Sequence, residues 1–338
     1  MARARLQDVA DRAGVSLATA SRVLNGSARQ PGADLVARVK AAASDLGYVV
    51  NAQAQALARA RSGLLGLVVQ DISDPYFSSI AAGAQAAARA SGRLVLLAST
   101  GRDPEAEREA VAAFAAHRVD AVVVAGTRWT PDEDAALAAE LDAFVAAGGR
   151  SVIVGQPVGD GSVVRPPNAT GARALAEALL AQGQRRFVVL GGPARVVTSR
   201  ERTEAFTAAA LAGGGDVAEV LVTEFSRDGG YAAGDDVATL VRAEAGDGEP
   251  LSVFAVTDVM AIGLIARLRE LGVEVPRDVR VAGFDDVPTL RDHVPALSTV
   301  RIPLEEMGSL AVQAAVGDAA PGAVTEVDFE VQLRDSTR

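Results

Sequence analysis

The sequence contains no cysteine, and its 338 residues include only two histidines and one tryptophan. Without cysteine the chain has no disulfide, no thiolate metal ligand and no cysteine nucleophile. No apolar run approaches the roughly 18 residues that a membrane-spanning helix needs, and the first ten residues, MARARLQDVA, lack the apolar core of a signal peptide. The composition therefore predicts a cytoplasmic protein with no membrane partner.

Groups that carry enzyme chemistry are also scarce. His117 precedes a predicted strand and His293 lies in the turn RDHVP, and neither has the serine or carboxylate spacing of a catalytic triad or metal site. The glycine-rich stretches at 191–193 and 212–216 match neither the phosphate-binding P-loop nor the GxGxxG motif. The sequence therefore predicts no catalytic residue, no metal site and no cofactor, and it assigns structural roles to both histidines.

Charge is distributed unevenly along the chain, although the formal net charge is −10. Residues 1–62 carry nine Lys or Arg and four Asp or Glu, a net +5, which leaves 24 basic and 39 acidic residues, a net −15, for the remainder. A cationic segment neutralises nucleic-acid phosphates, whereas an anionic body discourages non-specific adhesion. The sequence therefore predicts a DNA-binding head joined to a body with a different task.

Two short helical patterns occupy residues 6–25, and a third amphipathic stretch follows. The first pattern stops at Gly14, and Ser16 is placed to cap a second helix that ends near Asn25. The inner face of this second helix is Ala20, Val23 and Leu24. The arrangement is typical of a helix-turn-helix, whose second helix enters the major groove of DNA.

The outward face of the second predicted helix carries the expected DNA contacts. Arg22 can pair with a guanine through two hydrogen bonds, and Leu17 and Ala18 offer apolar contact to thymine methyl groups. Hydroxyl and amide side chains suit the phosphate contacts that fix the register of a protein on DNA. These side chains are Ser16, Thr19, Ser21 and Asn25. A small helical cap with a basic exposed face is the alternative interpretation of the same pattern.

After residue 63 the pattern changes to short apolar runs that alternate with alanine-rich helical stretches. The runs predict strands at 64–70, 94–98, 121–125, 151–155, 186–192, 219–225, 252–256 and 279–284. Such alternation is typical of α/β folds, in which helices cover both faces of parallel sheets. Eight units exceed one compact open sheet, so we expect two linked lobes with a ligand cleft at the carboxyl ends of the strands.

The runs LQDVADRAGVSLATASRVLNG, from residue 6, and LGYVVNAQAQALARARS, from residue 46, resemble the lactose-repressor (LacI/GalR) family of bacterial transcriptional regulators. The resemblance covers essentially the whole chain. It implies an all-α helix-turn-helix head and a two-lobed α/β body like the type I periplasmic sugar-binding proteins. The implied domains are a DNA-binding head at 1–48, a hinge helix at 49–62, and an effector-binding and dimerisation domain at 63–338. Within that domain, lobe 1 would span about 63–163 and 292–322, and lobe 2 about 164–291 and 323–338.

In this family the segment after the head is a hinge that orders on DNA in a dimer, and a leucine from each chain wedges into the minor groove. Leu57 stands at that position, with Asn51, Ala54 and Gln55 around it. An apolar wedge can unstack a base step, and a marginal helix can be ordered by its partner. Val50 replaces the usual proline. Gln55 begins a Gln-Ala pair in place of the usual Ala-Arg pair, and this second change removes a cation near the DNA backbone, which predicts weaker hinge binding.

The resemblance also implies an effector pocket in the body. The matching residues are Asp74, Tyr76, Phe77, Arg202, Phe225 and Asp285. The aromatic residues would stack on or enclose a sugar or base, and the charged residues would bind hydroxyl groups through directional hydrogen bonds. Without the resemblance, core packing would be the preferred explanation of the three aromatic residues.

Three positions of the expected pocket depart from the family pattern. Gln156 follows Gly155 where sugar-responsive relatives often have Asp-Arg, Thr257 replaces an asparagine before Asp258, and Ile302 replaces a glutamine. Each change removes charge or hydrogen-bonding capacity. We therefore expect a glycoside or another less polar metabolite more than a simple pentose or hexose.

The leading hypothesis is a homodimeric regulator that binds a pseudo-palindromic double-stranded operator and represses a catabolic operon. A small-molecule effector, a sugar or glycoside, would change the angle between the lobes and weaken operator binding. A corepressor response is also compatible with the sequence. The alternatives are a transport-type solute-binding protein, which predicts a signal peptide and no basic head, and an α/β enzyme, which needs a nucleophile, metal cluster or phosphate loop.

Overall fold

The computed structural model describes residues 4–25, 31–48, 62–243, 250–317, 320 and 322–338. The chain divides into two units, residues 1–63 and 64–338, here called the head and the body. None of the helices in the described part of the chain is long and apolar enough to cross a membrane.

The head is a three-helix unit around a small apolar core. Its helices are α1 (Leu6–Ala13), α2 (Leu17–Asn25) and α3 (Ala33–Asp45). Small side chains let the helices approach closely, and the buried residues include Val9, Ala10, Ala20 and Val39. The expected order of three helical segments is confirmed.

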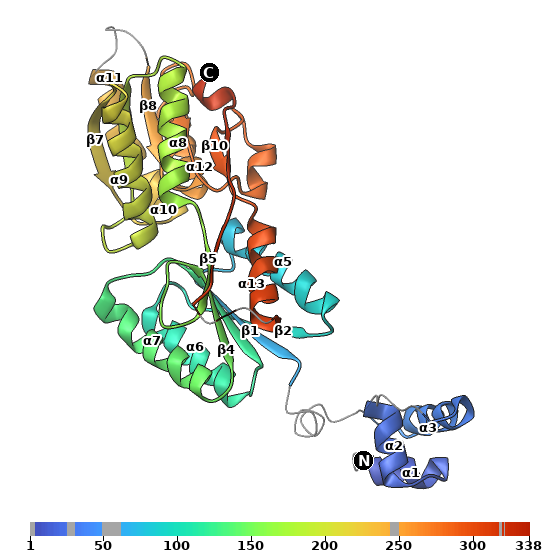
Figure 1. Cartoon of the computed structure of the whole chain (residues 1–338). Coiled ribbons are helices and arrows are strands. Elements are labelled where there is room, and N and C mark those ends of the chain that lie inside the picture. The colour runs from blue at the N-terminus through green and yellow to red at the C-terminus, as the bar shows by residue number, and fades with distance from the viewer. Residues whose placement is uncertain (1–3, 26–30, 49–61, 244–249, 318–319, 321) are drawn as a thin grey trace. The chain divides into compact units, whose positions relative to one another are not determined.

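Lobe 1 of the body is built on a parallel sheet of six strands in the order β11-β5-β4-β3-β1-β2. Its strands are β1 (Leu64–Val69), β2 (Leu94–Ser99), β3 (Ala121–Gly126), β4 (Arg150–Gly155), β5 (Ser162–Arg165) and β11 (Val324–Glu326). The central strands β1, β3 and β4 are buried over nearly their whole length, because helices cover both faces of the sheet (Figure 1).

Three helices of lobe 1 begin in the same way. These are α5 (Pro75–Ala90), α6 (Pro104–Ala116) and α7 (Pro131–Ala146). Each has proline in its first turn after an Asp or Thr whose side-chain oxygen accepts a backbone N–H. Because proline has no N–H to lose and the capping oxygen satisfies another donor, this sequence pair fixes where each helix starts.

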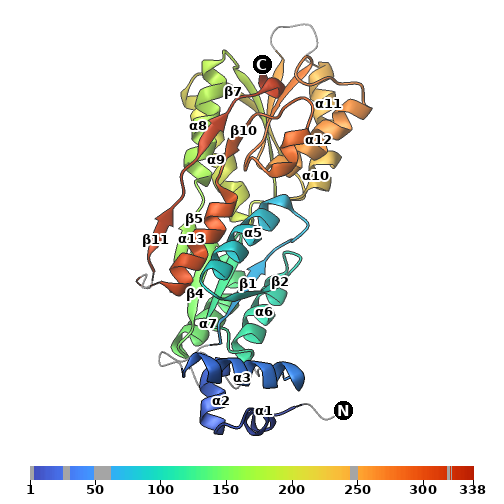
Figure 2. The same cartoon turned by 90° about the vertical axis from the view of Figure 1, so that its right-hand side faces the viewer.

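Helices α5 and α13 (Leu304–Val316) pack together on one face of the lobe 1 sheet, as Figures 1 and 2 show. Glycines allow the close approach, since a Cβ on Gly83 would overlap the Glu305 carbonyl and one on Gly308 would overlap the Ile80 carbonyl. Helices α6 and α7 cover the opposite face around Phe114.

Lobe 2 is built on a parallel sheet of four strands in the order β7-β6-β8-β9. Its strands are β6 (Arg186–Gly191), β7 (Asp216–Val222), β8 (Leu251–Ala255) and β9 (Val279–Ala282). Its helices are α8 (Asn168–Ala181), α9 (Val197–Ala212), α10 (Arg227–Ala232), α11 (Gly234–Ala243) and α12 (Asp258–Glu270). Helix α8 packs on α9, and α12 packs on α10 and α11, with the sheet between the two groups (Figure 2).

Short elements connect the lobes and complete lobe 2. They are the strands β10 (Thr299–Arg301) and β12 (Glu330–Gln332), which pair antiparallel, and the 3-10 helices η1 (Pro288–Asp292) and η2 (Asp335–Thr337). Three segments therefore cross between the lobes, from β5 to α8, from β10 to α13 and from β11 to β12 (Figure 2).

The two-lobed parallel architecture and all eight expected strands are confirmed. The four unexpected strands, β5, β10, β11 and β12, have only three or four residues, and among the expected strands only β9 is as short, so their periodicity is weak. The expected lobe limits at 291 and 322 fall too early. Strand β10 belongs to lobe 2, since Ser298 bridges Ala282 and β10 pairs with β12, and β11 still pairs with β5 in lobe 1.

Candidate functional site

The turn between α1 and α2 is fixed by backbone conformation and a side-chain cap. Gly14 adopts φ +64°, and its N–H bonds the carbonyls at the end of α1. The Ser16 hydroxyl accepts the Thr19 N–H at 3.2 Å and lies 2.8 Å from the Thr19 hydroxyl. The predicted capping role of Ser16 is confirmed, and the phosphate contacts of Ser16 and Thr19 stay predictions.

The outer face of α2 has the exposure expected of a reading surface. Ala20 is fully buried, whereas Leu17 keeps 45% of its surface and Ala18 and Arg22 are exposed. Ser21 is half-buried. The side chains on the face predicted to contact DNA therefore remain exposed after the head has folded.

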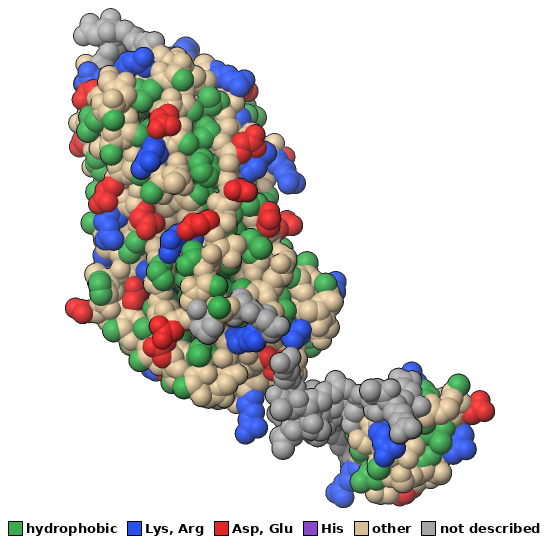
Figure 3. Space-filling model, in the orientation of Figure 1, with side chains coloured by type: hydrophobic (Ala, Val, Ile, Leu, Met, Phe, Trp, Pro, Cys, Tyr) green, Lys and Arg blue, Asp and Glu red, His purple; other side chains and the backbone are tan. Residues whose placement is uncertain are grey.

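The remaining predicted DNA contacts cannot be placed. The hinge residues Asn51, Ala54, Gln55 and Leu57 and the side chain of Asn25 lie outside the described residues. Their roles stay predictions. On the face of the body that Figure 3 shows, basic and acidic side chains are interspersed.

In the body, Arg202 on α9 is the centre of a buried polar cluster. Its side chain is 2% exposed, and its guanidinium lies 2.9 Å from the Asp285 carboxylate. The guanidinium also donates to the Asn168 side-chain oxygen at 3.0 Å and to the Val256 carbonyl at 2.8 Å. Because a buried cation requires such compensation, Arg202 holds the start of α8, the end of β8 and the loop after β9 in one arrangement.

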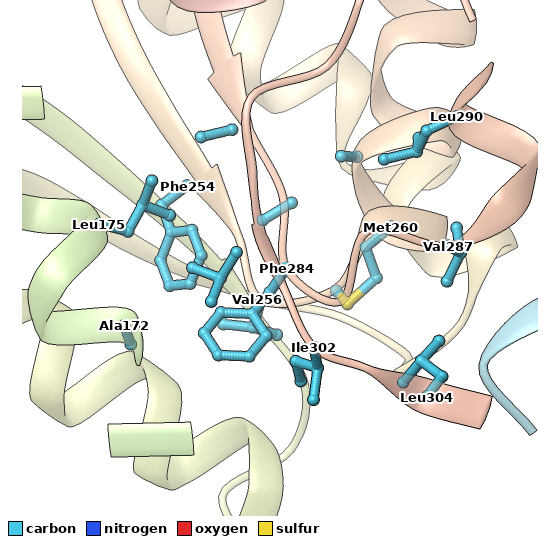
Figure 4. Close-up of a cluster of buried hydrophobic side chains, with 14 of the residues drawn as sticks. Ala172, Leu175, Phe254, Val256, Met260, Phe284, Val287, Leu290, Ile302 and Leu304 are labelled. Atoms are coloured by element: carbon cyan, nitrogen blue, oxygen red, sulfur yellow. The ribbon is translucent and has the colours of Figure 1, made fainter. Parts of the chain in front are cut away.

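Apolar side chains form the floor beneath this cation. The Arg202 guanidinium lies 3.8 Å from the centre of the Phe284 ring, and Figure 4 shows Val256 and Ile302 beside that ring. All three apolar residues belong to the main hydrophobic core. Ile302, at the position where the resemblance implies a glutamine, is 3% exposed and therefore contributes packing to the floor.

Asp285 is held in an unusual backbone conformation. Its φ is +117° and that of Asp286 is +55°, both in the region that favours glycine. The Asp286 carboxylate pairs with Arg301 and Arg334, each at 2.7 Å, which fixes the strained turn. Burial raises the pKa of Asp285 well above its usual value, and Arg202 opposes the shift. Strain of this kind is typical of functional sites.

The start of α5 brings a second group of predicted residues toward Arg202. Asp74 caps the helix through the Tyr76 N–H at 3.0 Å. Burial and then the Asp285 charge raise the pKa of the Tyr76 phenol, so the two side chains belong to one electrostatic neighbourhood. Phe77 is 5% exposed and lies in the core, where packing accounts for it without a ligand. Its stacking role stays a prediction.

Arg102 was not among the residues predicted from the sequence. It follows β2, and its guanidinium lies 3.4 Å from the Asp74 carboxylate, donates to the Phe225 carbonyl, and sits 5.6 Å from the centre of the Phe225 ring. Asp74 belongs to lobe 1 and Phe225 follows β7 of lobe 2, so Arg102 ties the lobes together. A lone arginine in a Gly-Arg-Asp turn carries no sequence signal of such a role.

A hydrogen-bonded chain extends from Arg202 toward lobe 1. The Asn168 amide donates to the Glu201 carboxylate at 2.8 Å, and the Gln156 amide donates to the same oxygen at 3.0 Å. The Gln156 side-chain oxygen Oε1 accepts the Arg128 backbone N–H at 3.1 Å. Gln156 was predicted, whereas Asn168 and Glu201 were not, because their partners come from distant segments.

The predicted residues Thr257 and Asp258 have structural partners. Thr257 caps α12 through the Met260 N–H at 3.3 Å. The Asp258 carboxylate is fully buried and accepts the Thr299 hydroxyl at 2.6 Å and the Val287 N–H at 2.9 Å. Burial raises its pKa to about 6. Asp258 therefore fixes the loop that carries Asp285, and direct effector contacts by this pair stay predictions.

The N-terminus of α9 is capped by the other lobe. Val196, the residue before the helix, gives no side-chain cap. Instead the Val197 N–H donates to the Arg128 carbonyl at 3.1 Å, and the Thr198 N–H donates to the Thr127 hydroxyl at 3.0 Å. Unsatisfied N–H groups of a helix end are costly, so these two bonds help to hold the lobes in this arrangement.

A cleft of about 1000 Å³ lies between the lobes on the side of Gln156 and Glu201. Its walls come from the loop after β3, the loop after β4, the start of α9 and two of the crossing segments. In the part of the chain that the structure describes, no group of three His, Asp or Glu side chains is placed to hold a metal ion.

Comparison with known protein families gives two matches. Residues 5–51 match the family described as bacterial regulatory proteins, lacI family. Residues 176–337 match the periplasmic binding protein-like domain.

Characterised relatives match over most of their own length. The HTH-type transcriptional regulator GalS of Salmonella typhimurium is 32% identical over 317 residues, covering 93% of this chain and 90% of GalS. The HTH-type transcriptional regulator CelR of Thermobifida fusca is 33% identical over 349 residues, covering 99% of this chain and 98% of CelR.

Solved structures of similar proteins have the same fold. A complex of the regulator CelR with cellobiose superposes with a TM-score of 0.69 at 29% identity, over 99% of this chain and 100% of that one. A Lac repressor bound to ONPG superposes with a TM-score of 0.82 at 23% identity, again over 99% and 100% of the two chains, a likeness that concerns the fold alone.

Proposed function

Because the chain belongs to the LacI family of bacterial regulatory proteins, we propose that it represses an operon until a small-molecule effector binds between its lobes. The family consists of DNA-binding regulators and not of enzymes, and this chain is an effector-controlled transcriptional regulator. The family match of its head also removes the transport-type solute-binding protein from consideration. Since operator DNA lies in the cytoplasm, the proposal places the protein there.

The exposed face of α2 is the observation that carries the DNA-binding part of the proposal. Gly14 and Ser16 fix the start of α2, and Leu17, Ala18 and Arg22 are exposed. We propose that Arg22 reads a guanine and that residues 49–62 form the hinge with Leu57 as the minor-groove wedge.

A homodimer on a pseudo-palindromic operator is part of the same proposal. Edge strands invite pairing or coverage, because they expose backbone groups and side chains. Strand β2 is an edge strand of the lobe 1 sheet, and its side chains Leu94 and Leu97 are exposed. Strand β7 is an edge strand of the lobe 2 sheet, and its side chains Val220 and Val222 are exposed. Both edges support contact with a second copy of the chain.

The proposed effector is a sugar or glycoside bound near Arg202. A directional ion pair, an adjacent aromatic side chain and a carboxylate suit hydroxyl groups and apolar C–H surface. The similar regulator CelR has been solved with cellobiose, which supports this ligand class. Effector binding at the contacts between the lobes would change the spacing of the two heads in a dimer.

The test is a mobility-shift assay with the full-length protein and a palindromic sequence from its own promoter region. We expect binding below micromolar concentration and release of the DNA when an effector from a sugar and glycoside screen is added. Tighter DNA binding with effector would instead make the protein a corepressor-dependent regulator. No binding to any palindrome of its own promoter would overturn the operator assignment.

A further inference from the structure

The 1000 Å³ cleft, here called the outer chamber, lies beside the Arg202 cluster, and neither Arg202 nor Asp285 lines it. Of the body residues predicted from the sequence, only Gln156 lines it. The other lining residues that matter here are Trp129, Asn168, Arg200, Glu201 and Phe329. Asn168 joins the two regions, since its oxygen accepts from Arg202 and its NH₂ group donates to Glu201.

The outer chamber is large for a single sugar ring. Pockets for small molecules span about 300–1,000 Å³, and this cleft reaches the upper end of that range. A hexose at the Arg202 cluster would leave most of the chamber filled with water. A ligand with two or more rings would occupy both regions and release that water.

Trp129 supplies a buried donor without a partner. Its side chain is 7% exposed, and its indole N–H makes no hydrogen bond to any residue that the structure describes. The Arg195 guanidinium covers one side of the ring at 5.0 Å from its centre. A buried N–H without a hydrogen-bond partner is unfavourable, so a ligand oxygen that reaches this N–H would gain affinity.

The charges around the chamber favour a neutral ligand. Three arginines line it against four carboxylates, so a phosphate or carboxylate ligand would gain little from the field of the chamber. The Glu201 carboxylate is fixed by the amides of Asn168 and Gln156 and can accept a hydroxyl. Aromatic rings, a fixed carboxylate and an unpaired N–H together suit a neutral polyhydroxylated ring.

We propose that the outer chamber is a second sugar subsite, so that the effector is a neutral oligosaccharide of two or more units. One unit binds at the Arg202 cluster and the next reaches past Asn168 to Trp129 and Glu201. This inference rests on the proposed function, because it assumes that the first unit binds at Arg202. Trp129 and Glu201 then determine the length of ligand that the regulator detects.

The single tryptophan of the chain makes the outer chamber directly observable. We would titrate the full-length protein with matched mono-, di- and trisaccharides, including glucose, cellobiose, cellotriose, maltose and maltotriose, and follow Trp129 fluorescence and binding calorimetry. We expect at least one oligosaccharide to shift the emission and to bind about 10-fold or more tighter than its component monosaccharide.

Two variants separate the subsite from a general effect on folding. Trp129→Phe keeps an aromatic ring but replaces the indole by a smaller phenyl group without the N–H. By calorimetry, we expect it to lower oligosaccharide affinity about 10-fold while monosaccharide affinity stays unchanged. Glu201→Gln is also expected to lower oligosaccharide affinity and to leave monosaccharide affinity unchanged. It tests the second subsite on its own if Trp129→Phe fails to fold. Tyr231→Phe, which does not line the chamber, is the matched control.

The outcomes distinguish this inference from the function on which it rests. If monosaccharides bind as tightly as oligosaccharides, or the variants weaken both classes equally, the second subsite is wrong and the sugar-controlled regulator stands. If no sugar or glycoside binds, the proposed effector class itself fails.

Discussion

The reading face of the head and the Arg202 cluster of the body are built in opposite ways. Leu17, Ala18 and Arg22 are exposed on α2, so the packing of the head does not depend on them. Arg202 and Asp285 are buried and paired with each other, so the body depends on the same groups that would bind effector. Specificity for DNA can therefore change without loss of stability, whereas effector specificity is coupled to the stability of the lobes.

The largest expected effect is at Arg202. Arg202→Ala leaves Asp285 as a buried charge without its partner, which costs about 3–5 kcal/mol. Chemical denaturation should show this loss in the free energy of unfolding. Arg200→Ala, two residues earlier on the same helix and exposed, should change stability by less than about 0.5 kcal/mol. If Arg202→Ala lowered the free energy of unfolding by less than about 1 kcal/mol, the body would not depend on the Arg202 cluster for its stability, and the contrast with the exposed face of α2 would be wrong.

The next effect concerns pH. Burial raises the pKa of Asp258 to about 6, above its ordinary value of 3.8, so the folded state binds the proton more tightly than the unfolded state. Stability from this group is therefore greatest below about pH 4 and falls as the pH rises through 6, by about 3 kcal/mol. The stability advantage of the parent over Asp258→Asn should shrink accordingly between pH 4 and 7. An advantage that grows with pH would contradict the assignment, and the exposed Asp228→Asn serves as the control.

Arg22→Ala tests the other side of the comparison. We expect unfolding within about 0.5 kcal/mol of the parent protein and a loss of about 1–3 kcal/mol of discrimination between operator and scrambled DNA. Fluorescence anisotropy with both DNAs measures this difference. Arg12→Ala, on α1 and paired with Asp45 at the surface, is the matched control. Unchanged discrimination would move the base-reading role away from Arg22.

The smallest expected effect tests whether the hydrogen bonds between the lobes contribute to effector binding. Thr127→Val removes the hydroxyl that caps α9 from lobe 1, and a lost cap costs about 1 kcal/mol. Because that cap joins the two lobes, effector affinity should fall about fivefold, as measured by calorimetry. Asp103→Ala removes the cap of α6 within lobe 1 and should lower stability but leave effector affinity unchanged. Equal affinity losses in both variants would mean that the cap between the lobes has no special role.

Local patterns determined much of this architecture. The eight expected strands, the three head helices and the capping role of Ser16 followed from periodicity, Gly14 and hydroxyl placement. These features depend on neighbours within one turn or strand, which the sequence contains directly. The inward residues Ala20 and Val23 and the outward residue Arg22 also follow from helical spacing alone.

Long-range contacts decided the rest. Whether Phe77 faces core or ligand depends on how α5 packs, and the partners of Asp258 come from Thr299 and Val287, far along the chain. No sequence signal pointed to Arg102, Asn168 or Glu201. Arg102 pairs with Asp74, and Asn168 bonds Glu201, so the role of each residue depends on a partner that is distant in the sequence. The sequence by itself determined a basic helix-turn-helix head on an α/β body, because charge and periodicity are local properties. Only the tertiary structure decided which polar groups pair with one another and which line an open chamber, because hydrogen-bond partners come together from segments that are distant in the sequence.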